Sequence, residues 1–297
     1  MRFGVLTPVV IRSPGRFRAW ESAAGVDELV TVARAADRLG YHHLTCSEHV
    51  AVPAVDAELR GGTYWDPLAT LSYLAAHTSH IGLATHVLVL GYHHPLAVVK
   101  RYGTLDRLSH GRVILGVGVG TLEAEFHLLG APFAGRGATA DDAIRAIRAA
   151  WGRRAPTYEG THYQFGDVIV DPHAPRTEVP IWVGGRTLRS LRRAVTLAHG
   201  WAPFRLSPER ISALLAQVRP PTGFDVVLGT SPLDPIGDPD GTRRHVDAMV
   251  AAGATIINAV FHHLDCAHYV AQLTALRDLY PEATWRTSER QTSVATS

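Results

Sequence analysis

The stretch ILGVGVGTLEAEFHLLG, residues 114–130, decides between two α/β folds for this chain. It places Gly116, Gly118 and Gly120 directly after a β-branched run and before an amphipathic segment, as a dinucleotide-binding unit does. That fingerprint needs a third glycine three residues after the second, where this chain has Thr121. It also belongs to the first strand–helix unit of its domain, whereas three such units precede this stretch. A Rossmann fold is therefore not predicted, and the alternative is a strand whose small residues face a crowded barrel interior.

The rest of the chain alternates short β-branched runs with longer helical patterns. The predicted strands are residues 3–9, 42–50, 80–90, 111–120, 180–185, 199–204, 224–232 and 255–261. The predicted helices are residues 27–40, 66–78, 95–109, 140–152, 187–198, 208–218, 240–253 and 267–280, with a hairpin over 155–172. Eight strand–helix pairs predict a single-domain (β/α)8 TIM barrel over residues 1–280, with an insertion after strand 4 at about residues 121–178. The Thr- and Ser-rich segment 281–297 is expected to be a flexible tail.

The composition is that of a soluble globular protein with one large core. The chain has 297 residues, 46% hydrophobic and 19% charged content, and a formal net charge of +2. Because this charge is small and no basic run occurs, neither nucleic acid nor an anionic membrane is expected as a partner. Cys46 and Cys266 do not make a disulfide framework, and the sequence shows no signal-peptide pattern and no apolar run of about 18 residues. We expect a cytoplasmic protein.

Residues with chemical potential follow several predicted strands. In a (β/α)8 barrel the active site is formed by the loops after the carboxyl ends of the strands. Those positions hold Ser47, Glu48 and His49 after strand 2, His86 and Val87 in strand 3 with Tyr92, His93 and His94 beyond it, Gly118, Gly120 and Thr121 after strand 4, Gly184, Gly185 and Arg186 after strand 5, and residues 201–204 after strand 6. We expect these residues to meet at one end of the barrel.

The segment PIWVGGRTLRSLRRA, residues 180–194, predicts a phosphate site. Gly184 and Gly185 let backbone N–H groups approach an anion at a helix N-terminus, and Arg186 can add a bidentate contact. The alternative is a tight strand-to-helix turn that needs glycine only for its backbone angles.

Two further groups of residues bear on catalysis. His49 follows Glu48 at a strand exit, where an imidazole can exchange protons near neutral pH. His86, His93 and His94 could be considered as metal ligands, but metal-binding barrel hydrolases tend to carry a His-x-His pair after strand 1. Because strand 1 here ends LTPVV, no metal is predicted.

Taken in order, these segments resemble the bacterial-luciferase-like superfamily of flavin and deazaflavin oxidoreductases, and within it the group that depends on coenzyme F420. The resemblance runs from residue 3 to about residue 280. It is carried by ARAADRLGYHHLTCSEHV, the long segment from YWDPLATLSYL to GRVILGVGVG, AEFHLLGAPFAGRG, YEGTHYQF, PIWVGGRTLRSLRRA and HGWAP.

The resemblance implies the roles of individual residues. Family members hold the ring at the barrel mouth, against a bulge in strand 3 that often contains a non-proline cis peptide, here His86–Val87. Glu48 and His49 match the acid–histidine pair that approaches the ring, and they are the predicted catalytic residues. The implied cofactor-binding residues are His86, Val87, Gly118, Val119, Gly120, Thr121, Gly184, Gly185, Arg186 and Trp201.

Two positions depart from the family pattern. Sugar-phosphate dehydrogenases of the family carry a glutamate acid after the strand-4 glycines, where this chain has Thr121. His86 is bulkier than the small residue more usual before the bulge, so it narrows the space near the ring or offers it a hydrogen bond.

The resemblance implies an F420-dependent oxidoreductase that transfers a hydride between the deazaflavin C5 and a medium-sized organic substrate. An FMN-dependent monooxygenase that uses reduced flavin and oxygen is the alternative, and a non-catalytic binding protein is a third possibility. A pocket wall of Trp20, Tyr64, Trp65 and Tyr92 is expected over the ring. A homodimer is expected because family members often pair through barrel helices.

Overall fold

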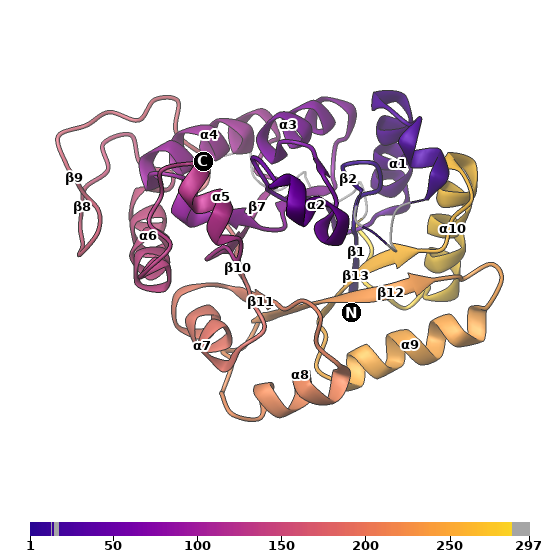
Figure 1. Cartoon of the computed structure of the whole chain (residues 1–297). Coiled ribbons are helices and arrows are strands. Elements are labelled where there is room, and N and C mark those ends of the chain that lie inside the picture. The colour runs from indigo at the N-terminus through magenta and orange to yellow at the C-terminus, as the bar shows by residue number, and fades with distance from the viewer. Residues whose placement is uncertain (13, 15–17, 287–297) are drawn as a thin grey trace, which may run out of the picture.

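The computed structural model describes residues 1–12, 14 and 18–286, and a barrel of parallel strands ringed by helices organises that part of the chain (Figure 1). Eight parallel strands of the described chain close on themselves. In order around the barrel they are β1 (Arg2–Val5), β3 (His43–Cys46), β5 (Gly82–Thr85), β7 (Val113–Gly118), β10 (Ile181–Gly184), β11 (Gly200–Ala202), β12 (Asp225–Leu233) and β13 (Ile256–Phe261). The predicted (β/α)8 barrel is confirmed.

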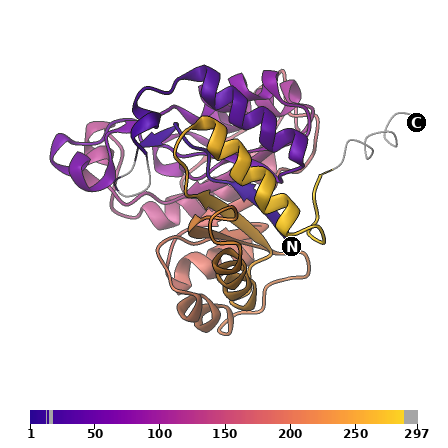
Figure 2. The ribbon, with the colours of Figure 1, turned by 90° about the vertical axis from the view of Figure 1, so that its right-hand side faces the viewer.

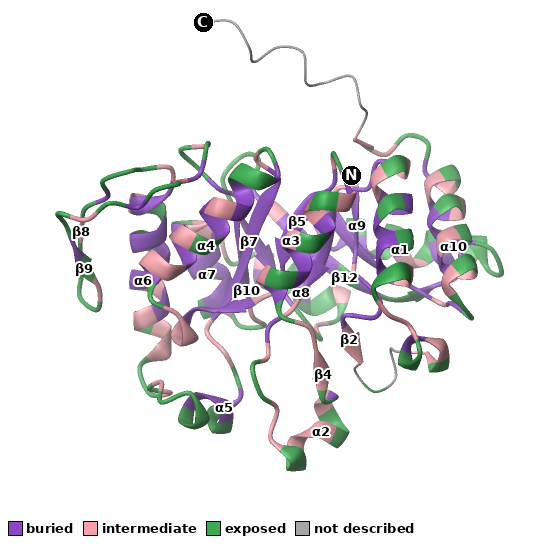
Figure 3. Ribbon diagram, turned by 90° about the horizontal axis from the view of Figure 1, so that it is seen from above, coloured by how far each residue is buried: buried purple, intermediate pink, exposed green. Residues whose placement is uncertain are grey.

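Eight helices of the described chain follow these strands and cover the outside of the barrel. They are α1 (Val26–Leu39), α3 (Pro67–His77), α4 (Pro95–Leu108), α6 (Arg136–Ala150), α7 (Leu188–Leu197), α8 (Pro208–Leu215), α9 (Pro239–Ala251) and α10 (Cys266–Leu279). Figure 3 shows the inner faces of these helices buried and their outer faces exposed, as amphipathic patterning requires. Helix α10 packs beside α1 where β13 pairs with β1, and this contact closes the barrel (Figure 2).

Local signals in the sequence explain where the helices begin and end. Asp66 caps α3, because its Oδ1 accepts a hydrogen bond from the N–H of Ala69 at 2.7 Å, and Pro67 takes the first helical position. Gly40 ends α1 in the left-handed conformation, with φ of 82°. Aspartate, proline and glycine are residues that favour these three helix-end positions.

Strand side chains alternate between two cores. One core lies inside the barrel and consists of Ala84, Ile114, Trp182, Ala202, Val227 and Ile256. The other lies between strands and helices, and includes Leu83, Leu115, Val183 and Trp201. Because successive strand residues point to opposite faces, each strand supplies both cores, and its last inward residues face the barrel mouth.

The third strand is interrupted. Its first part, β5, ends at Thr85, and its second part, β6 (Leu88–Val89), pairs with Val117 and Gly118 of β7. Between the two parts lies a cis peptide bond joining His86 and Val87. The bulge and the cis peptide expected at these two residues are confirmed.

The loops after strands 1, 2 and 4 project from one end of the barrel. They carry β2 (Ile11–Arg12), the 3-10 helix η1 (Ala19–Ser22), α2 (Ala54–Arg60), β4 (Thr63–Tyr64) and α5 (Glu123–Leu128). The 3-10 helix η2 (Leu90–Tyr92) follows the third strand, and the hairpin of β8 (Tyr158–Glu159) and β9 (Gln164–Phe165) follows α6. Figure 3 shows β4, α2 and α5 together at the end of the barrel opposite the N-terminus. The predicted first strand, residues 3–9, is shorter than expected, because the chain leaves the sheet after Val5 and Val9 adopts a positive φ of 73°.

The predicted tail begins with residues that pack on the barrel. Trp285 stacks on Phe3 with ring centroids 5.3 Å apart, and the N–H of Arg286 donates to the carbonyl of Gly40 at 2.8 Å. These contacts hold the start of the tail at the amino end of the barrel, which the composition of the segment did not indicate. The remainder, residues 287–297, lies outside the described residues. Across the described ranges, no helix combines the length and the apolar content that crossing a bilayer takes.

Candidate active site

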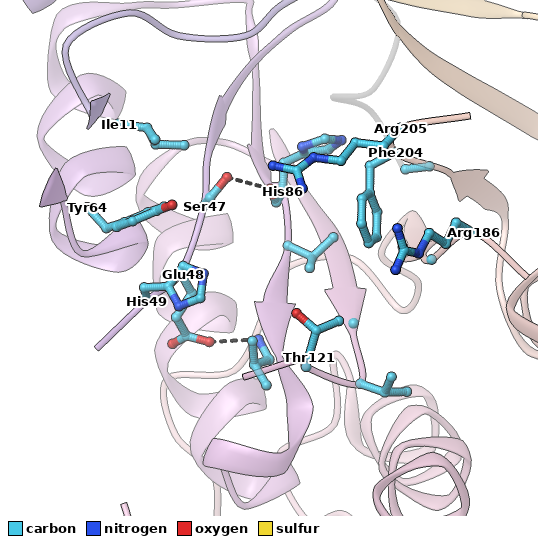
Figure 4. A pocket seen from close by; sticks show the side chains of 18 of the residues that line it. Ile11, Ser47, Glu48, His49, Tyr64, His86, Thr121, Arg186, Phe204 and Arg205 are labelled. Atoms are coloured by element: carbon cyan, nitrogen blue, oxygen red, sulfur yellow. Dashed lines mark hydrogen bonds between the residues drawn. The ribbon is translucent and has the colours of Figure 1, made fainter. Parts of the chain in front are cut away.

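A cavity of about 760 Å³ opens at the carboxyl ends of the strands. Most of the predicted site residues line it, namely Glu48, His49, Tyr64, His86, Val87, Tyr92, Gly118, Val119, Gly120, Thr121, Gly184, Gly185 and Arg186. Figure 4 shows Glu48, His49 and Tyr64 on one side of the cavity and Arg186 on the other, with His86 and Thr121 between them. A volume of this size holds a multi-ring cofactor or a smaller ring together with a substrate.

The floor of the cavity is a small apolar surface formed by the side chain of Val87, called the apolar step below. A Cβ added to Gly118 would lie 2.7 Å from Val87 Cγ2, and one added to Gly184 would lie 2.9 Å from Val87 Cγ1. Both positions therefore accept only glycine while Val87 keeps its place. The result is a half-buried aliphatic surface between two glycine-containing backbone segments that line the cavity, which suits the face of a flat ring.

The rim of the cavity carries a histidine–carboxylate pair. His49 Nδ1 lies 2.7 Å from Glu125 Oε2, and the His49 ring packs edge-on against Tyr64, with centroids 4.5 Å apart. Glu125 is fully buried and also accepts hydrogen bonds from the N–H groups of Val50 and Ala51 and from the hydroxyl of Tyr92. Since all its partners can donate, Glu125 holds Nδ1–H of His49 and leaves Nε2 as the remaining proton-exchange site.

Glu48 is held differently from its neighbour. Its Oε2 accepts from the N–H of Val89 and its Oε1 lies close to His93 Nε2, both at 2.7 Å. The carboxylate is buried, with a relative exposure of 6%. With both oxygens engaged, Glu48 fixes the segment that follows the cis peptide.

The opposite side of the cavity combines a helix N-terminus with arginine side chains. Gly185 has φ of 133°, and a Cβ there would lie 2.6 Å from Ser190 Cβ, so the turn requires glycine. Thr187 caps α7 by accepting from the N–H of Ser190 at 3.2 Å. Arg186 and Arg189 line the cavity beside this N-terminus. An anionic group fits here, because the helix end and both guanidinium groups favour negative charge.

Three predicted site residues do not line the cavity. Trp201 is fully buried on the helix side of β11 and donates its indole N–H to Ser190 Oγ at 3.3 Å. Trp65 packs against the outer core. Trp20 donates its indole N–H to His263 Nδ1 at 2.8 Å and lies behind that ring.

His263 and Glu21 line the cavity and were missed by the sequence analysis. The indole of Trp20 can only donate, so Nδ1 of His263 accepts and Nε2 carries the proton of the neutral ring. Burial, reinforced by the charge of Arg18, lowers the pKa of His263 to about 4, and burial raises the pKa of Glu21. His263 follows strand 8 directly and could have been found by the strand-end rule. Glu21 and Glu125 lie in loops that carry no such signal.

The histidines considered as metal ligands point to different partners. His93 pairs with Glu48, and His94 caps α4 by accepting from the N–H of Leu96 at 3.2 Å. Among the residues that the structure describes, no group of three or more His, Cys, Asp or Glu side chains is arranged to hold a metal ion.

Comparisons with known sequences point to one family. A family model described as luciferase-like monooxygenase matches residues 1–292. The F420-dependent glucose-6-phosphate dehydrogenase of Microbacterium testaceum is 30% identical over 188 residues, which cover 62% of this chain and 54% of that enzyme. Uncharacterised Mycobacterium tuberculosis proteins match at 32% identity, and the chain spans 64% of their length.

Solved structures share the fold. The monooxygenase RslO1 from Streptomyces bottropensis has a TM-score of 0.74 at 23% identity, over 95% of this chain and 99% of that one. The F420-dependent tetrahydromethanopterin reductase from Methanopyrus kandleri has a TM-score of 0.75 at 15% identity, with the same coverage. Because the family model spans nearly the whole chain, this protein belongs to the luciferase-like monooxygenase family.

Proposed function

We propose that this protein is an F420-dependent oxidoreductase that transfers a hydride between the deazaflavin and a medium-sized organic substrate. The observation that carries the proposal is the apolar step at Val87, enclosed by Gly118 and Gly184 on the floor of a cavity of about 760 Å³. The match to an enzyme described as F420-dependent supports the choice of cofactor.

The residues of the cavity fit such a group. Val87 would support one face of the ring, and the backbone of residues 118–120 would run beside the chain that links ring and phosphate. The α7 N-terminus with Arg186 and Arg189 would hold the phosphate. When bound, the deazaflavin supplies the hydride donor or acceptor at C5, while the protein supplies orientation and electrostatics.

His49 is the proposed proton-exchange residue. Its Nδ1–H is engaged by the buried Glu125, so Nε2 can give a proton to the substrate or take one from it. Glu48, predicted as a catalytic partner, is proposed instead as a positioning residue, because both of its oxygens are engaged by Val89 and His93.

The test is equilibrium binding of oxidised F420 and, separately, of FMN to the purified protein. Preferential binding of F420 supports the proposal and directs the search to substrates that are oxidised or reduced without oxygen. Preferential binding of FMN, or no binding of F420, overturns it.

A monooxygenase that uses reduced FMN and oxygen is the second candidate. It is favoured by the description of the family and by the shared fold of RslO1. A flavin carries nitrogen where the deazaflavin carries C5, and reduced flavin reacts with oxygen. Oxygen consumption by the protein with reduced FMN and a candidate substrate, above the rate without protein, would support this candidate. A homodimer stays a prediction that light scattering in solution can test.

A further inference from the structure

The cavity is rich in unneutralised arginine. Six arginines of the described chain line it, namely Arg60, Arg136, Arg186, Arg189, Arg193 and Arg205. Of these, only Arg193 forms an ion pair within the described residues, with Asp141. The two lining carboxylates do not offset the excess, because they are fewer than the unpaired arginines and neither contacts one of them: Glu48 is paired with His93, and Glu21 accepts from the backbone N–H groups of Val9 and Arg18.

These arginines fall into two groups by their place in the fold. Arg186 and Arg189 lie at the first turn of α7, which the proposed function assigns to the cofactor phosphate, and Arg136 and Arg193 lie on the neighbouring parts of α6 and α7. Arg60 comes instead from the end of α2, and Arg205 from the loop after β11. Figure 4 shows Phe204 between Arg186 and Arg205, with the Arg205 guanidinium directed away from Arg186.

Arg60 lies beside Tyr64, and Arg205 reaches toward His86 from the wall of the cavity that carries Phe204 (Figure 4). The Tyr64 hydroxyl donates to the backbone carbonyl of Arg60 at 2.8 Å. Burial raises the pKa of Tyr64, while the charges of Arg60 and Arg205 oppose this rise, so both cations lie within electrostatic range of its hydroxyl. Tyr64, Arg60 and Arg205 all line the cavity, and the ring of His49 packs against Tyr64.

Two features indicate that this arrangement is prepared for a ligand. Nε of Arg60 is fully buried and has no hydrogen-bond partner among the described residues. A buried donor without an acceptor is costly, and a shift of the Arg60 side chain toward a bound anion would relieve that cost. Arg205 is held at φ of 52°, a conformation that non-glycine residues seldom adopt and that recurs at functional sites.

We propose that the substrate is an organic anion, a carboxylate or a phosphate ester, whose charged group is bound by Arg60 and Arg205 beside Tyr64. Arginine suits this task because its planar fork binds both kinds of anion in a bidentate manner. The inference rests on the proposed function for the statement that this ligand is the substrate. Held there, the body of the substrate would lie between His49 and the ring that the apolar step at Val87 supports.

The test uses probes of similar shape and different charge. 3-Phenylpropanoate, the neutral 3-phenylpropanamide and phenyl phosphate are titrated calorimetrically into the protein saturated with F420, which occupies the phosphate corner beside α7. At least one charged probe is expected to bind tenfold or more tightly than the amide. The stronger of the two charged probes then identifies the substrate as a carboxylate or a phosphate ester.

Variants test which residues are responsible. Arg60→Gln and Arg205→Gln are each expected to lower the affinity for the charged probe at least fivefold. Arg60→Lys is expected to recover part of that loss of affinity. Arg101→Gln, on the exposed face of α4, is the matched control and should bind like wild type. Equal affinity for charged and neutral probes, absence of binding by all three, or wild-type affinity in both glutamine variants would overturn the proposal.

Failure of the proposed function is distinguishable from failure of the anion site. F420 binding is measured first, and its absence contradicts the proposed function alone. In that case the carboxylate and amide probes are titrated into the cofactor-free protein, because phenyl phosphate could then occupy the α7 corner. A preference for the carboxylate that is lost in Arg60→Gln still supports the anion site, and its absence overturns it.

Discussion

His49 and Glu125 are hydrogen-bonded at 2.7 Å although 76 positions separate them in the chain. His49 follows the second barrel strand, while Glu125 lies on α5, in the insertion after the fourth. The buried carboxylate therefore ties the insertion to the loop that carries the proposed proton-exchange residue. This hydrogen bond makes α5 part of the candidate active site.

Replacing Glu125 should destabilise the protein far more than replacing its neighbour on the same helix. Glu125→Ala removes a buried carboxylate that accepts from the N–H groups of Val50 and Ala51 and from the Tyr92 hydroxyl, which we expect to cost about 2 kcal/mol of unfolding free energy. Glu123→Ala, whose exposed side chain makes only a weak pair with His127, should change it by less than about 0.5 kcal/mol. Urea unfolding measures both, and equal effects would contradict the role given to Glu125.

His49→Ala should slow turnover without removing the cofactor. For any compound that the wild type oxidises or reduces, we expect kcat to fall by about 100- to 10,000-fold, the range for a lost acid or base. The affinity for F420 should change little, because Nε2 of His49 serves the substrate. Stopped-flow absorbance of F420 together with cofactor binding gives both quantities. Full turnover in His49→Ala would refute the assignment.

The apolar step at Val87 predicts that glycine substitutions differ sharply in their effect on the affinity for F420. Gly118→Ala and Gly184→Ala place a Cβ within 3 Å of Val87, so Val87 must shift, and we expect affinity for F420 to fall at least tenfold. Gly166→Ala, whose Cβ would meet Thr157 at an ordinary 3.8 Å in the hairpin, is the control. Wild-type affinity in both cavity variants would show that Val87 does not support the ring.

His42, at the amino end of the barrel, should make the unfolding free energy decrease at acid pH. Burial, with smaller contributions from the charges of Arg286 and Arg2, lowers the pKa of His42 to about 3, and His42 Nδ1 lies 3.0 Å from Nδ1 of the buried His43. The unfolded chain therefore binds a proton on His42 at higher pH than the folded chain does. The contribution of the neutral His42 ring to the unfolding free energy is therefore complete above a pH of about 6.5, and it is lost progressively as the pH falls toward 3.

When the pH is lowered from 7 to 5, protonation of His42 in the unfolded chain should reduce the unfolding free energy by about 1–2 kcal/mol. His42→Gln should flatten the pH dependence over that interval, whereas His127→Gln, at an exposed position, should leave it unchanged. Urea unfolding at the two pH values measures the difference. Identical slopes in wild type and His42→Gln would rule out the contribution of His42.

The sequence by itself determined the barrel, the order of its elements, their caps and the end of the barrel where the site lies. These features follow from local rules, namely helical and strand periodicity, the cap at Asp66, and the convergence of parallel strand ends. For the same reason His49, Val87 and Arg186 could be assigned to one cavity before their positions were known.

Only the tertiary structure decided which side chains face that cavity and which partners they have. Trp201 and Ala202 are neighbours on β11, yet Trp201 packs toward the helices and Ala202 toward the barrel interior, because the pleat sends successive residues to opposite faces. A shift of one residue in register reverses such an assignment. The pairing of His49 with Glu125 likewise depends on where α5 comes to rest, which packing between distant loops determines and no local sequence pattern records.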